Sequence, residues 1–349
     1  MFFASDNAGP AHPRVMDALV AANQGYASGY GADAPMVEVR QMIRDIFEAP
    51  EAAVHLVATG TAANALTLAT LSNPWEAIFC TPMAHIHEDE CNAPEFYTGG
   101  AKLALVEAID AKMTAPTLLA AIEREETRGV HGPQRGPVSI TQATEKGTVY
   151  TTAELMALTD VARSFGLKTH LDGARFTNAL VSLGCTPAEM TWKAGIDAVS
   201  FGGTKNGLIG VEACVFFDPA VSKQFELRRK RGAHLFSKHR YLSAQMHAYL
   251  TDDLWLNMAR QANAACARLV QGLEQVEEVE IQFPPQSNLL FFSAPRSMHQ
   301  RALQAGAVYY VTGGDPDSGP ADERLTGRLV CDWSCDHGAI DRFIAHLRQ

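Results

Sequence analysis

Short apolar runs alternate with segments of helical periodicity along the first two thirds of the chain. The apolar runs predict strands at 55–58, 78–80, 103–106, 138–141, 167–171 and 198–201, and the run from Gly210 to Phe217 predicts a further strand of the same sheet. Apolar residues between 36 and 47 recur at helical spacing, and helices are also predicted at 115–126, 153–165 and 176–183. Alternating strands and helices are typical of a largely parallel sheet with helices on both faces, so we expect an α/β fold.

The last third of the chain has a different pattern. A long helical region runs from about Ser222 to Gln275, with an interruption near Gly232. Beyond it, apolar segments at 280–283, 289–292 and 329–333 alternate with helical patterns, which predicts a small α/β unit. Because 349 residues are many for one hydrophobic core, we expect an N-terminal arm and large domain over 1–245 and a small domain over 246–349.

Composition and charge narrow the class of protein. Hydrophobic residues make up 47% of the chain, the formal net charge is −10 and the isoelectric point is near 5.6. This charge argues against nucleic acid or an anionic membrane as the main partner. The first residues turn polar by Ser5 without a signal-peptide pattern, and no apolar stretch has the length of a membrane span. The seven cysteines are scattered, so we expect a protein of the reducing cytoplasm.

The candidate chemistry lies in two polar segments that follow apolar runs. The segment from Thr169 to Arg175 places Asp172 at the end of one predicted strand, and the segment from Ser200 to Gly207 places Lys205 after the next. One strand–helix–strand unit of roughly 30 residues separates them, so both side chains are expected at the sheet edge where ligands of open α/β folds bind. Pyridoxal phosphate needs such a pair, because an acid keeps its pyridine nitrogen protonated and a lysine carries its aldehyde as a Schiff base.

Each of these residues also has a simpler interpretation. Asp172 could cap the turn before the next helix, and Lys205 could be a surface lysine in a Gly-rich turn. The small residues around Lys205 nevertheless leave room for a bulky ring, and the apolar strand before it predicts a partly buried amine with a lowered pKa. Gly60 and Thr61, at the start of a predicted helix, offer backbone N–H groups to a phosphate, although a Gly-Thr turn alone is a weak signal.

The segment His85-Ile86-His87-Glu88-Asp89-Glu90 contains the residue types of a metal site. On a strand His85 and His87 would share a face, whereas on a helix they would diverge. We favour the interpretation that one histidine lies flat on the cofactor ring, and we expect no metal. Cys331 and Cys335 form only a weak metal pattern, because no second Cys/His cluster accompanies them.

Seven segments spread over most of the chain carry a resemblance to a known family. They are Ser5-Asp6-Asn7, Gly29-Tyr30-Gly31 with Asp33, Thr59 to Asn64, Ala84-His85-Ile86, His170 to Arg175, Ser200 to Gly207, and Arg328 to Trp333. Together they resemble the L-threonine aldolases of the low-specificity type, which are pyridoxal-phosphate enzymes of fold-type I in the β-eliminating lyase group. The resemblance implies an aspartate-aminotransferase-like large domain with a mostly parallel seven-stranded sheet, a small C-terminal α/β domain, and pyridoxal 5'-phosphate as the cofactor.

The resemblance also implies roles around the cofactor. Lys205 is expected to bind its aldehyde, Asp172 to pair with the ring nitrogen, and His85 to stack on the ring. Gly60 and Thr61 are expected to hold the phosphate.

On the substrate side, the resemblance implies that Arg328 and Ser5 bind the carboxylate. Arg175 is expected near the same site or near the cofactor's phenolic oxygen. Tyr30 and the stretch from Arg229 to Arg231 are expected to reach a neighbouring subunit's site. This implies a homo-oligomer, typically a tetramer built as a dimer of dimers, with active sites at the subunit interface.

The implied reaction is the retro-aldol cleavage of L-threonine, L-allo-threonine or another β-hydroxy-α-amino acid, such as phenylserine, to glycine and an aldehyde. One departure concerns the proton acceptor. Many family members place a Thr-His pair in the loop after the strand that ends here near Thr141, whereas this chain has Gln142 next and Thr144 at roughly the histidine position. The base that takes the β-hydroxyl proton is therefore open between His85, His87 and a bound water.

Three alternatives to this activity stay open at this point. Another fold-type I enzyme, either a β-eliminating lyase or an aminotransferase, would use the same Lys205, Asp172 and Gly60. A binding protein could keep the fold without turnover, although the intact lysine and acid argue against it. A nucleotide-binding α/β protein is disfavoured, because no Gly-x-Gly-x-x-Gly follows a first strand. The motifs leave the preferred substrate and the number of subunits undecided.

Overall fold

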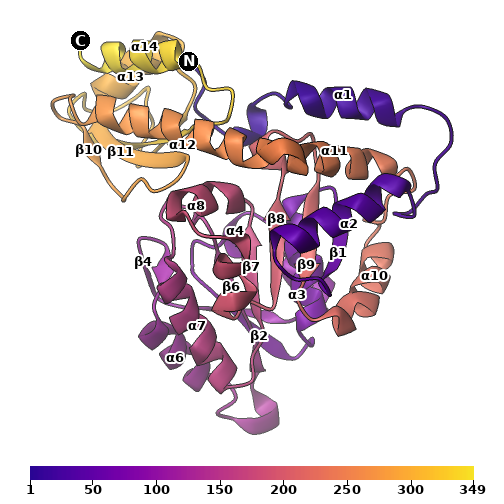
Figure 1. The fold of residues 1–349 in the computed structure, drawn as a ribbon. Helices are drawn as coiled ribbons and strands as arrows, with labels where there is room; N and C mark the ends of the chain where they lie inside the picture. Colours follow the sequence, from indigo (N-terminus) through magenta and orange to yellow (C-terminus); the bar gives the residue numbers. More distant parts are fainter.

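The computed structural model describes all 349 residues and contains a large α/β unit with a smaller unit at one end (Figure 1). The large unit is built on a seven-stranded sheet in the order β1-β9-β8-β7-β6-β2-β3. Its strands are β1 (Ala53–Val57), β2 (Glu76–Cys80), β3 (Lys102–Leu105), β6 (Gln134–Thr141), β7 (Thr169–Gly173), β8 (Ala198–Gly202) and β9 (Glu212–Phe216). Strands β3, β2, β6, β7 and β8 are parallel, and β9 is antiparallel to both of its neighbours. The predicted fold class is confirmed.

Hydrophobic layers on both faces of this sheet are set by the alternation of side chains along its strands. Leu56, Phe79 and Val199 belong to the layer shared with α2, α6, α7, α8 and α11, whereas their neighbours Val57 and Ile78 belong to layers shared with α3. The helices of the large unit are α1 (Pro13–Ala22), α2 (Ala34–Ile46), α3 (Gly60–Leu71), α4 (His85–Glu88), α5 (Ala93–Thr98), α6 (Ala115–Arg124), α7 (Thr152–Ser164), α8 (Phe176–Leu183), α9 (Pro187–Met190), α10 (Ser222–Arg231) and α11 (Arg240–Leu250).

The smaller unit is an antiparallel four-stranded sheet with helices packed on it, in the order β10-β11-β13-β12. Its elements are α12 (Leu254–Leu273), β10 (Glu280–Ile281), β11 (Leu289–Pro295), α13 (Arg296–Gln304), β12 (Tyr310–Thr312), β13 (Arg324–Val330) and α14 (His337–Leu347). Helix α12 serves both units, because Trp255 and Met258 belong to the core of the large unit while Cys266 and Leu269 belong to the core of the small one. A domain boundary near residue 245 therefore stays a prediction.

The N-terminal arm runs from the small unit to the large one. The Phe3 N–H donates to the Val308 carbonyl at 2.8 Å, and the Val330 N–H donates to the Phe3 carbonyl at 2.8 Å. The following 3-10 turn η1 (Asp6–Ala8) reaches residues of both units. The arm therefore connects the edge of the small sheet with the carboxyl ends of the parallel strands.

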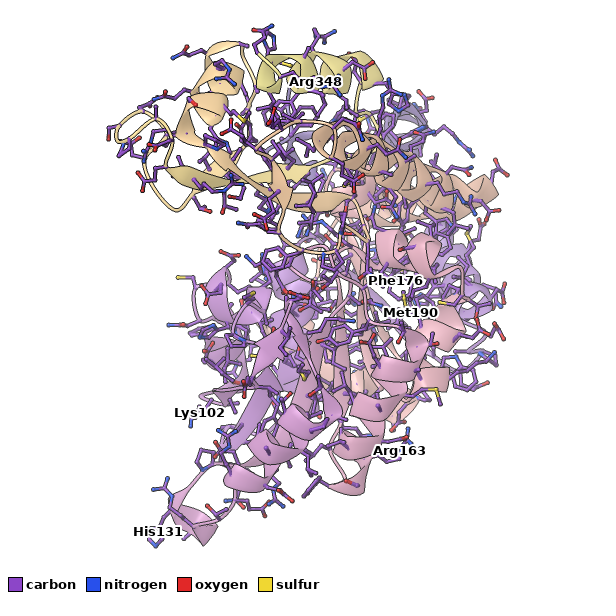
Figure 2. All side chains as sticks on the ribbon, turned by 90° about the vertical axis from the view of Figure 1, so that its left-hand side faces the viewer. Lys102, His131, Arg163, Phe176, Met190 and Arg348 are labelled. Atoms are coloured by element: carbon purple, nitrogen blue, oxygen red, sulfur yellow. The ribbon has the colours of Figure 1, made fainter.

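The two ends of the molecule are marked by Arg348 in the small unit and by His131 in the 3-10 turn η2 (Gly129–His131) (Figure 2). Turn η2 lies just before β6, at the amino ends of the parallel strands. The carboxyl ends of the same strands lie on the side of the small unit. No helix has both the length and the apolar character needed to cross a membrane.

Three details differ from the predicted elements. The long helical region has the predicted interruption near Gly232 and a second, unpredicted break at Asp252, which has a φ of +53°, so it is divided into α10, α11 and α12. The strand predicted at 329–333 is wrong in extent, because β13 ends at Val330 and leaves Trp333 outside. The hairpin of β4 (Ala108–Ile109) and β5 (Lys112–Met113) is absent from the prediction, since two residues a strand are too few to show alternation.

Candidate active site

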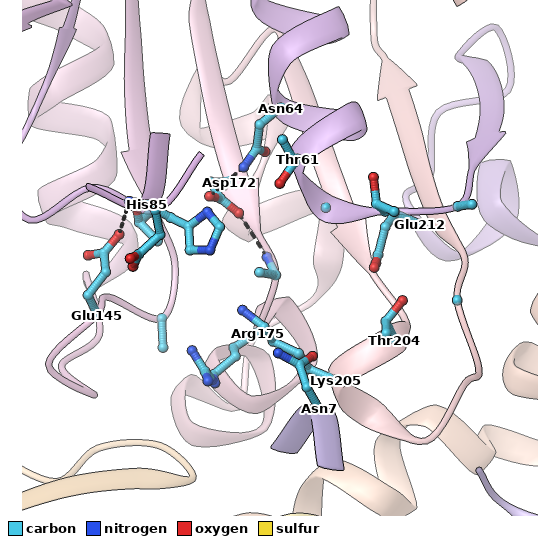
Figure 3. Close-up of a pocket in the computed structure, with 18 of the residues that line it drawn as sticks. Asn7, Thr61, Asn64, His85, Glu145, Asp172, Arg175, Thr204, Lys205 and Glu212 are labelled. Carbon is cyan, nitrogen blue, oxygen red and sulfur yellow. Dashed lines mark hydrogen bonds between the residues drawn. The ribbon is translucent and has the colours of Figure 1, made fainter. Parts of the chain in front are cut away.

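A cavity of about 500 Å³ opens at the carboxyl ends of the central parallel strands (Figure 3). Its wall is built from η1, α3, the start of α4, the loop after β6, the end of β7 and the 3-10 turn η4 (Thr204–Asn206). Six predicted site residues line it: Gly60, Thr61, His85, Asp172, Arg175 and Lys205. The position agrees with the general rule that open α/β sheets bind ligands at the carboxyl ends of their strands.

Asp172 lies near the end of β7, with only 2% of its surface exposed. Its Oδ1 accepts the Ala174 N–H at 3.1 Å, and its Oδ2 accepts the side-chain amide of Asn64, from α3, at 2.8 Å. Both donors are neutral, so they orient the carboxylate without cancelling its charge. The charge is therefore available to a cationic group inside the cavity.

Behind Asp172, His170 joins three neighbouring strands. Its Nδ1 lies 3.0 Å from the Ser139 hydroxyl on β6, and its Nε2 lies 2.9 Å from the Ser200 hydroxyl on β8. Burial lowers the pKa of His170 to about 4, so the ring is neutral at physiological pH. These two hydrogen bonds hold β7 between β6 and β8, and the neutral ring places no positive charge beneath Asp172.

Lys205 lies in η4, the turn that follows β8. The turn requires small residues: a Cβ on Gly203 would lie 2.5 Å from the Leu208 side chain, and Gly207 has a φ of +91°. Burial, and then the nearby charge of Arg175, lowers the pKa of Lys205, although surrounding carboxylates oppose the shift. More of this amine is unprotonated at neutral pH than on an exposed lysine, and the unprotonated form is the one that attacks an aldehyde.

The first turn of α3 presents free backbone donors to the cavity. The Thr59 side chain caps the helix by accepting the Ala62 N–H at 3.1 Å, while the N–H groups of Gly60 and Thr61 have no acceptor within the protein. A Cβ added to Gly60 would meet nothing within 4 Å, so the cavity is open at this point. Free N–H groups and the positive end of the helix dipole form a site for a phosphate.

His85 begins α4, and its ring points into the cavity beside Asp172 (Figure 3). Its Nδ1 lies 2.8 Å from Oε1 of Glu90, which is 3% exposed, so Nε2 is left for the cavity. The Asn64 amide donates to the same Glu90 oxygen at 2.9 Å and to Asp172 at 2.8 Å. The hydrogen bond that the Glu90 carboxylate accepts from His85 raises the pKa of His85, although burial opposes the shift. His85 is therefore equipped to accept a proton at Nε2.

The second histidine of this segment lies elsewhere, because α4 is helical and the two side chains diverge. His87 does not line the cavity, and its Nδ1 lies 2.9 Å from the Pro82 carbonyl and 3.0 Å from a Glu88 oxygen. His87 is therefore not placed to act on a ligand in the cavity. No three His, Cys, Asp or Glu side chains of the molecule are grouped so that they could hold a metal ion.

The loop after β6 brings Glu145, rather than Thr144, to the cavity. Thr144 is fully buried, with its hydroxyl 2.7 Å from that of Thr148. Glu145 lines the cavity, and its Oε1 accepts the backbone N–H of His85 at 3.0 Å. Burial raises the pKa of Glu145 to about 7. A carboxyl group that titrates near neutrality beside His85 is a second candidate for moving a proton on this side of the cavity.

Arg175 is paired with Asp6 of the N-terminal arm. Its Nε and Nη2 donate to the two Asp6 oxygens at 2.7 and 2.9 Å, and the side chains are 9% and 0% exposed. The Asn288 amide donates to the same carboxylate at 3.1 Å. Burial alone would raise the pKa of Asp6, but the charges of Arg175 and Lys205 outweigh it and hold the pKa below its ordinary value. Arg175 thus fixes the arm to the site, in addition to lining it.

The other predicted substrate-binding residues lie outside the cavity wall. The Ser5 hydroxyl accepts the Asn7 N–H at 3.1 Å and caps η1. Arg328, on β13, donates to the Ala4 carbonyl at 3.1 Å, and burial lowers its pKa. Tyr30 is 53% exposed and does not reach the cavity of its own chain. The roles expected for these three residues stay predictions.

The arrangement fits pyridoxal phosphate. The free N–H groups of Gly60 and Thr61 suit its phosphate, the buried Asp172 suits a protonated ring nitrogen, and the Lys205 amine suits its aldehyde. Thr61 and Asp172 lie at one end of the cavity and Lys205 at the other (Figure 3). All three requirements are therefore met in one cavity, without rearrangement of the chain.

Five acidic or amide side chains support the cavity although no role is predicted for them: Asp6, Asn64, Glu90, Glu145 and Glu212. Asn64 ends the segment that begins at Thr59, and Glu90 ends the segment that begins at His85. Nothing in either segment predicts that these two side chains contact each other. Glu212 has a clearer signal, since it is a charged residue inside an apolar run that continues to Phe217. A buried charge at a strand end is often functional.

Comparisons with known proteins agree with this geometry. The model of the beta-eliminating lyase family matches residues 3–295. The chain is 37% identical to a low specificity L-threonine aldolase of a Pseudomonas species and 38% identical to one of Pseudomonas aeruginosa, and each match covers 99% of this chain and 96% of the relative. The predicted resemblance is thus confirmed at the level of sequence.

Solved structures extend the comparison. The threonine aldolase of Leishmania major is 27% identical, with a TM-score of 0.92 over 99% of this chain and 98% of the other. A serine palmitoyltransferase of Sphingomonas wittichii shares only the fold, with 14% identity and a TM-score of 0.72 over 100% of this chain and 86% of the other. The chain belongs to the beta-eliminating lyase family of pyridoxal-phosphate-dependent enzymes and, within it, to the low-specificity L-threonine aldolases.

Proposed function

We propose that this enzyme cleaves L-threonine, L-allo-threonine and related β-hydroxy-α-amino acids, such as phenylserine, to glycine and an aldehyde. The observation that carries the proposal is the cavity in which Lys205, Asp172 and the amino end of α3 converge. Its support from relatives is the full-length similarity to low specificity L-threonine aldolases. The specific roles below follow from the contacts of each side chain.

Three groups of residues would hold the cofactor. Lys205 binds its aldehyde, because burial favours the neutral amine. The Asp172 carboxylate keeps a proton on the ring nitrogen, and the N–H groups of Gly60 and Thr61 bind the phosphate. When bound, pyridoxal phosphate supplies an electron-accepting ring that stabilises the charge developing on the substrate's α-carbon.

The substrate's carboxylate is assigned to residues at the N-terminal arm, and its β-hydroxyl is assigned to His85. Arg328 and Ser5 bind the carboxylate, which fixes the orientation of the α-carbon and so selects the bond that breaks. Arg175 supports them by holding Asp6 and the arm in place. The proton of the β-hydroxyl passes to Nε2 of His85, whose partner Glu90 makes the ring more basic.

We also infer a homo-oligomer, a dimer of dimers, in which Tyr30 reaches the cavity of a neighbouring subunit. The exposure of Tyr30 and of Tyr26, which is fully exposed, supports an interface at this surface. Arg229 is excluded from this contact, because it is 4% exposed and donates to the Leu56 carbonyl of its own chain at 3.1 Å. Light scattering at several protein concentrations tests the assembly, and a monomer at all of them would contradict it. A cytoplasmic location stays a prediction.

The activity is tested by incubating the holoenzyme with L-threonine and assaying acetaldehyde and glycine. Replacing Lys205 with Ala is expected to reduce the rate about a thousandfold or more. Lys193→Ala is the matched control, because Lys193 is 41% exposed, forms an ion pair with Glu48 at 2.6 Å and lies away from the cavity. Near wild-type activity of the Lys205 variant would refute the proposal. Formation of ammonia and a keto acid instead of glycine would assign the enzyme to the β-eliminating lyases or aminotransferases.

A further inference from the structure

Strand β9 brings one acidic side chain to the cavity that the proposed reaction does not use. Glu212 is the first residue of β9, opposite Gly202 of β8 and Val57 of β1, and it is 6% exposed. Its Oε2 accepts the Gly203 N–H at 2.7 Å. Thr204, in the same turn, also forms hydrogen bonds with the carboxyl group through its side chain and its backbone. Glu212 lines the cavity, so the turn that carries Lys205 holds this carboxyl group at a place where a ligand can meet it.

The surroundings of Glu212 are those of an anion site. Thr61, Thr204 and Glu212 gather on one side of the cavity, while His85 and Glu145 lie on the other (Figure 3). The free N–H groups of the α3 terminus face the same side. The cofactor phosphate therefore belongs beside Glu212.

Few charges of the chain are available to balance a phosphate at this place. Helix α3 has no charged residue, and β1 has only His55, whose pKa burial lowers to about 3. The other titratable groups that face Glu212 are Tyr249 from α11, Cys214 from its own strand, and Lys205. Lys205 is the only cation among them, and its task is to bind the aldehyde. An ionised Glu212 would thus repel the phosphate, against the attraction of the α3 terminus and of Lys205.

We propose that Glu212 binds the cofactor phosphate as a neutral carboxylic acid, with its Oε1 hydroxyl donating a hydrogen bond to a phosphate oxygen; the identity of that phosphate rests on the proposed function. Protonation is easily reached, since burial raises the pKa of Glu212 to about 7 even with Lys205 nearby. A phosphate beside it stabilises the neutral acid further. Cofactor binding is then coupled to one proton, which an ionised Glu212 takes up before the phosphate is bound.

The test is the pH dependence of cofactor affinity. The dissociation constant of pyridoxal phosphate is measured on the apoenzyme from about pH 6 to about pH 9, for the wild type and for Glu212→Gln. In the wild type the dissociation constant is expected to rise by up to about tenfold per pH unit above neutrality. Glu212→Gln is expected to lose this component, because the amide donates an N–H at every pH. Ionisation of the phosphate affects both proteins alike. The charge of Glu212 also raises the pKa of Lys205, and the pyridoxal control below keeps this effect while it removes the phosphate.

Two controls sharpen the result. Pyridoxal lacks the phosphate, so its binding to the wild type is expected to lack the same component. Glu145→Gln removes the other buried cavity acid with a pKa raised to about 7, and it is expected to keep the wild-type dependence on pH.

Equal pH dependence in the wild type and Glu212→Gln overturns the inference, and so does equal dependence for pyridoxal and pyridoxal phosphate. If Glu212→Gln does not fold, the comparison of the two ligands on the wild type decides alone. Failure of the proposed function would look different: the protein would bind pyridoxal phosphate with the expected pH dependence and yet release no glycine from L-threonine.

Discussion

Replacing Asp6 with Asn removes the negative charge that holds Arg175, while it keeps the size of the side chain. The carboxylate accepts two hydrogen bonds from Arg175 and one from Asn288, and the pair is almost completely buried. An Asn oxygen can still accept one Arg175 N–H, but its NH₂ group then faces another donor. The Arg175 guanidinium is left buried without a counter-charge.

Removing one partner of a buried ion pair costs about 3–5 kcal/mol, because the remaining charge is uncompensated. We expect the free energy of unfolding to fall by about 3 kcal/mol in Asp6→Asn at neutral pH, since one hydrogen bond to Arg175 survives. The pKa of Asp6 is lowered in the folded protein, so the stability from its ionised form is present above about pH 4, the ordinary value, and is lost as pH falls through the lowered pKa. The difference between wild type and variant is therefore expected to shrink in acid.

The assay is urea unfolding followed by circular dichroism, at fixed concentrations of protein and cofactor. The matched control is Asp160→Asn, because Asp160 pairs with Arg163 at the same 2.7 Å but both side chains are about two thirds exposed. This control is expected to change the free energy of unfolding by no more than about 1 kcal/mol. A loss in Asp6→Asn no larger than in Asp160→Asn would refute the assignment of Asp6 and Arg175 as the buried link between arm and site.

Three further substitutions probe the site and its turns. Glu90→Gln replaces the carboxylate that raises the pKa of His85 with a neutral amide, so the acidic limb of the pH–rate profile, where His85 becomes protonated and stops acting as a base, is expected to move to lower pH; an unmoved limb contradicts this role. Gly207→Ala is expected to lower the free energy of unfolding by about 2 kcal/mol, because φ is +91° and the new Cβ would lie 2.6 Å from the Met258 sulfur; an unchanged urea midpoint contradicts this. Gly60→Ala, whose Cβ meets nothing within 4 Å, is expected to change the same free energy by less than about 1 kcal/mol.

The residues that the sequence predicts correctly for the cavity occupy local, repeating positions. Asp172 and Lys205 each follow an apolar run, and Gly60 begins a helix after another, so the strand pattern alone places all three at one edge of the sheet. The apolar runs that identify these positions lie directly before them in the chain. No knowledge of distant contacts is needed for such a prediction.

The residues that the sequence does not predict depend on contacts between distant segments. Asp6 and Arg175 are 169 positions apart, and Asn64 and Asp172 are 108 apart, so no periodicity connects them. Irregular backbone is the second obstacle. In η1, Asp6 turns inward while the adjacent Ser5 caps the turn, and after β6 the loop turns Glu145 to the cavity. Which of two neighbouring side chains faces a ligand is decided there by the conformation of a few residues.

The path of the chain through both units also sets an order of assembly during synthesis on the ribosome. The large sheet is complete at Phe216, but its core lacks Trp255 and Met258 until α12 has left the ribosome. The arm waits longer still, since Phe3 bonds to Val308 and Val330. The first residues to be made are thus among the last to find their partners. A nascent chain that ends before β13 lacks Val330, so the arm reaches its full set of partners only when synthesis is nearly finished.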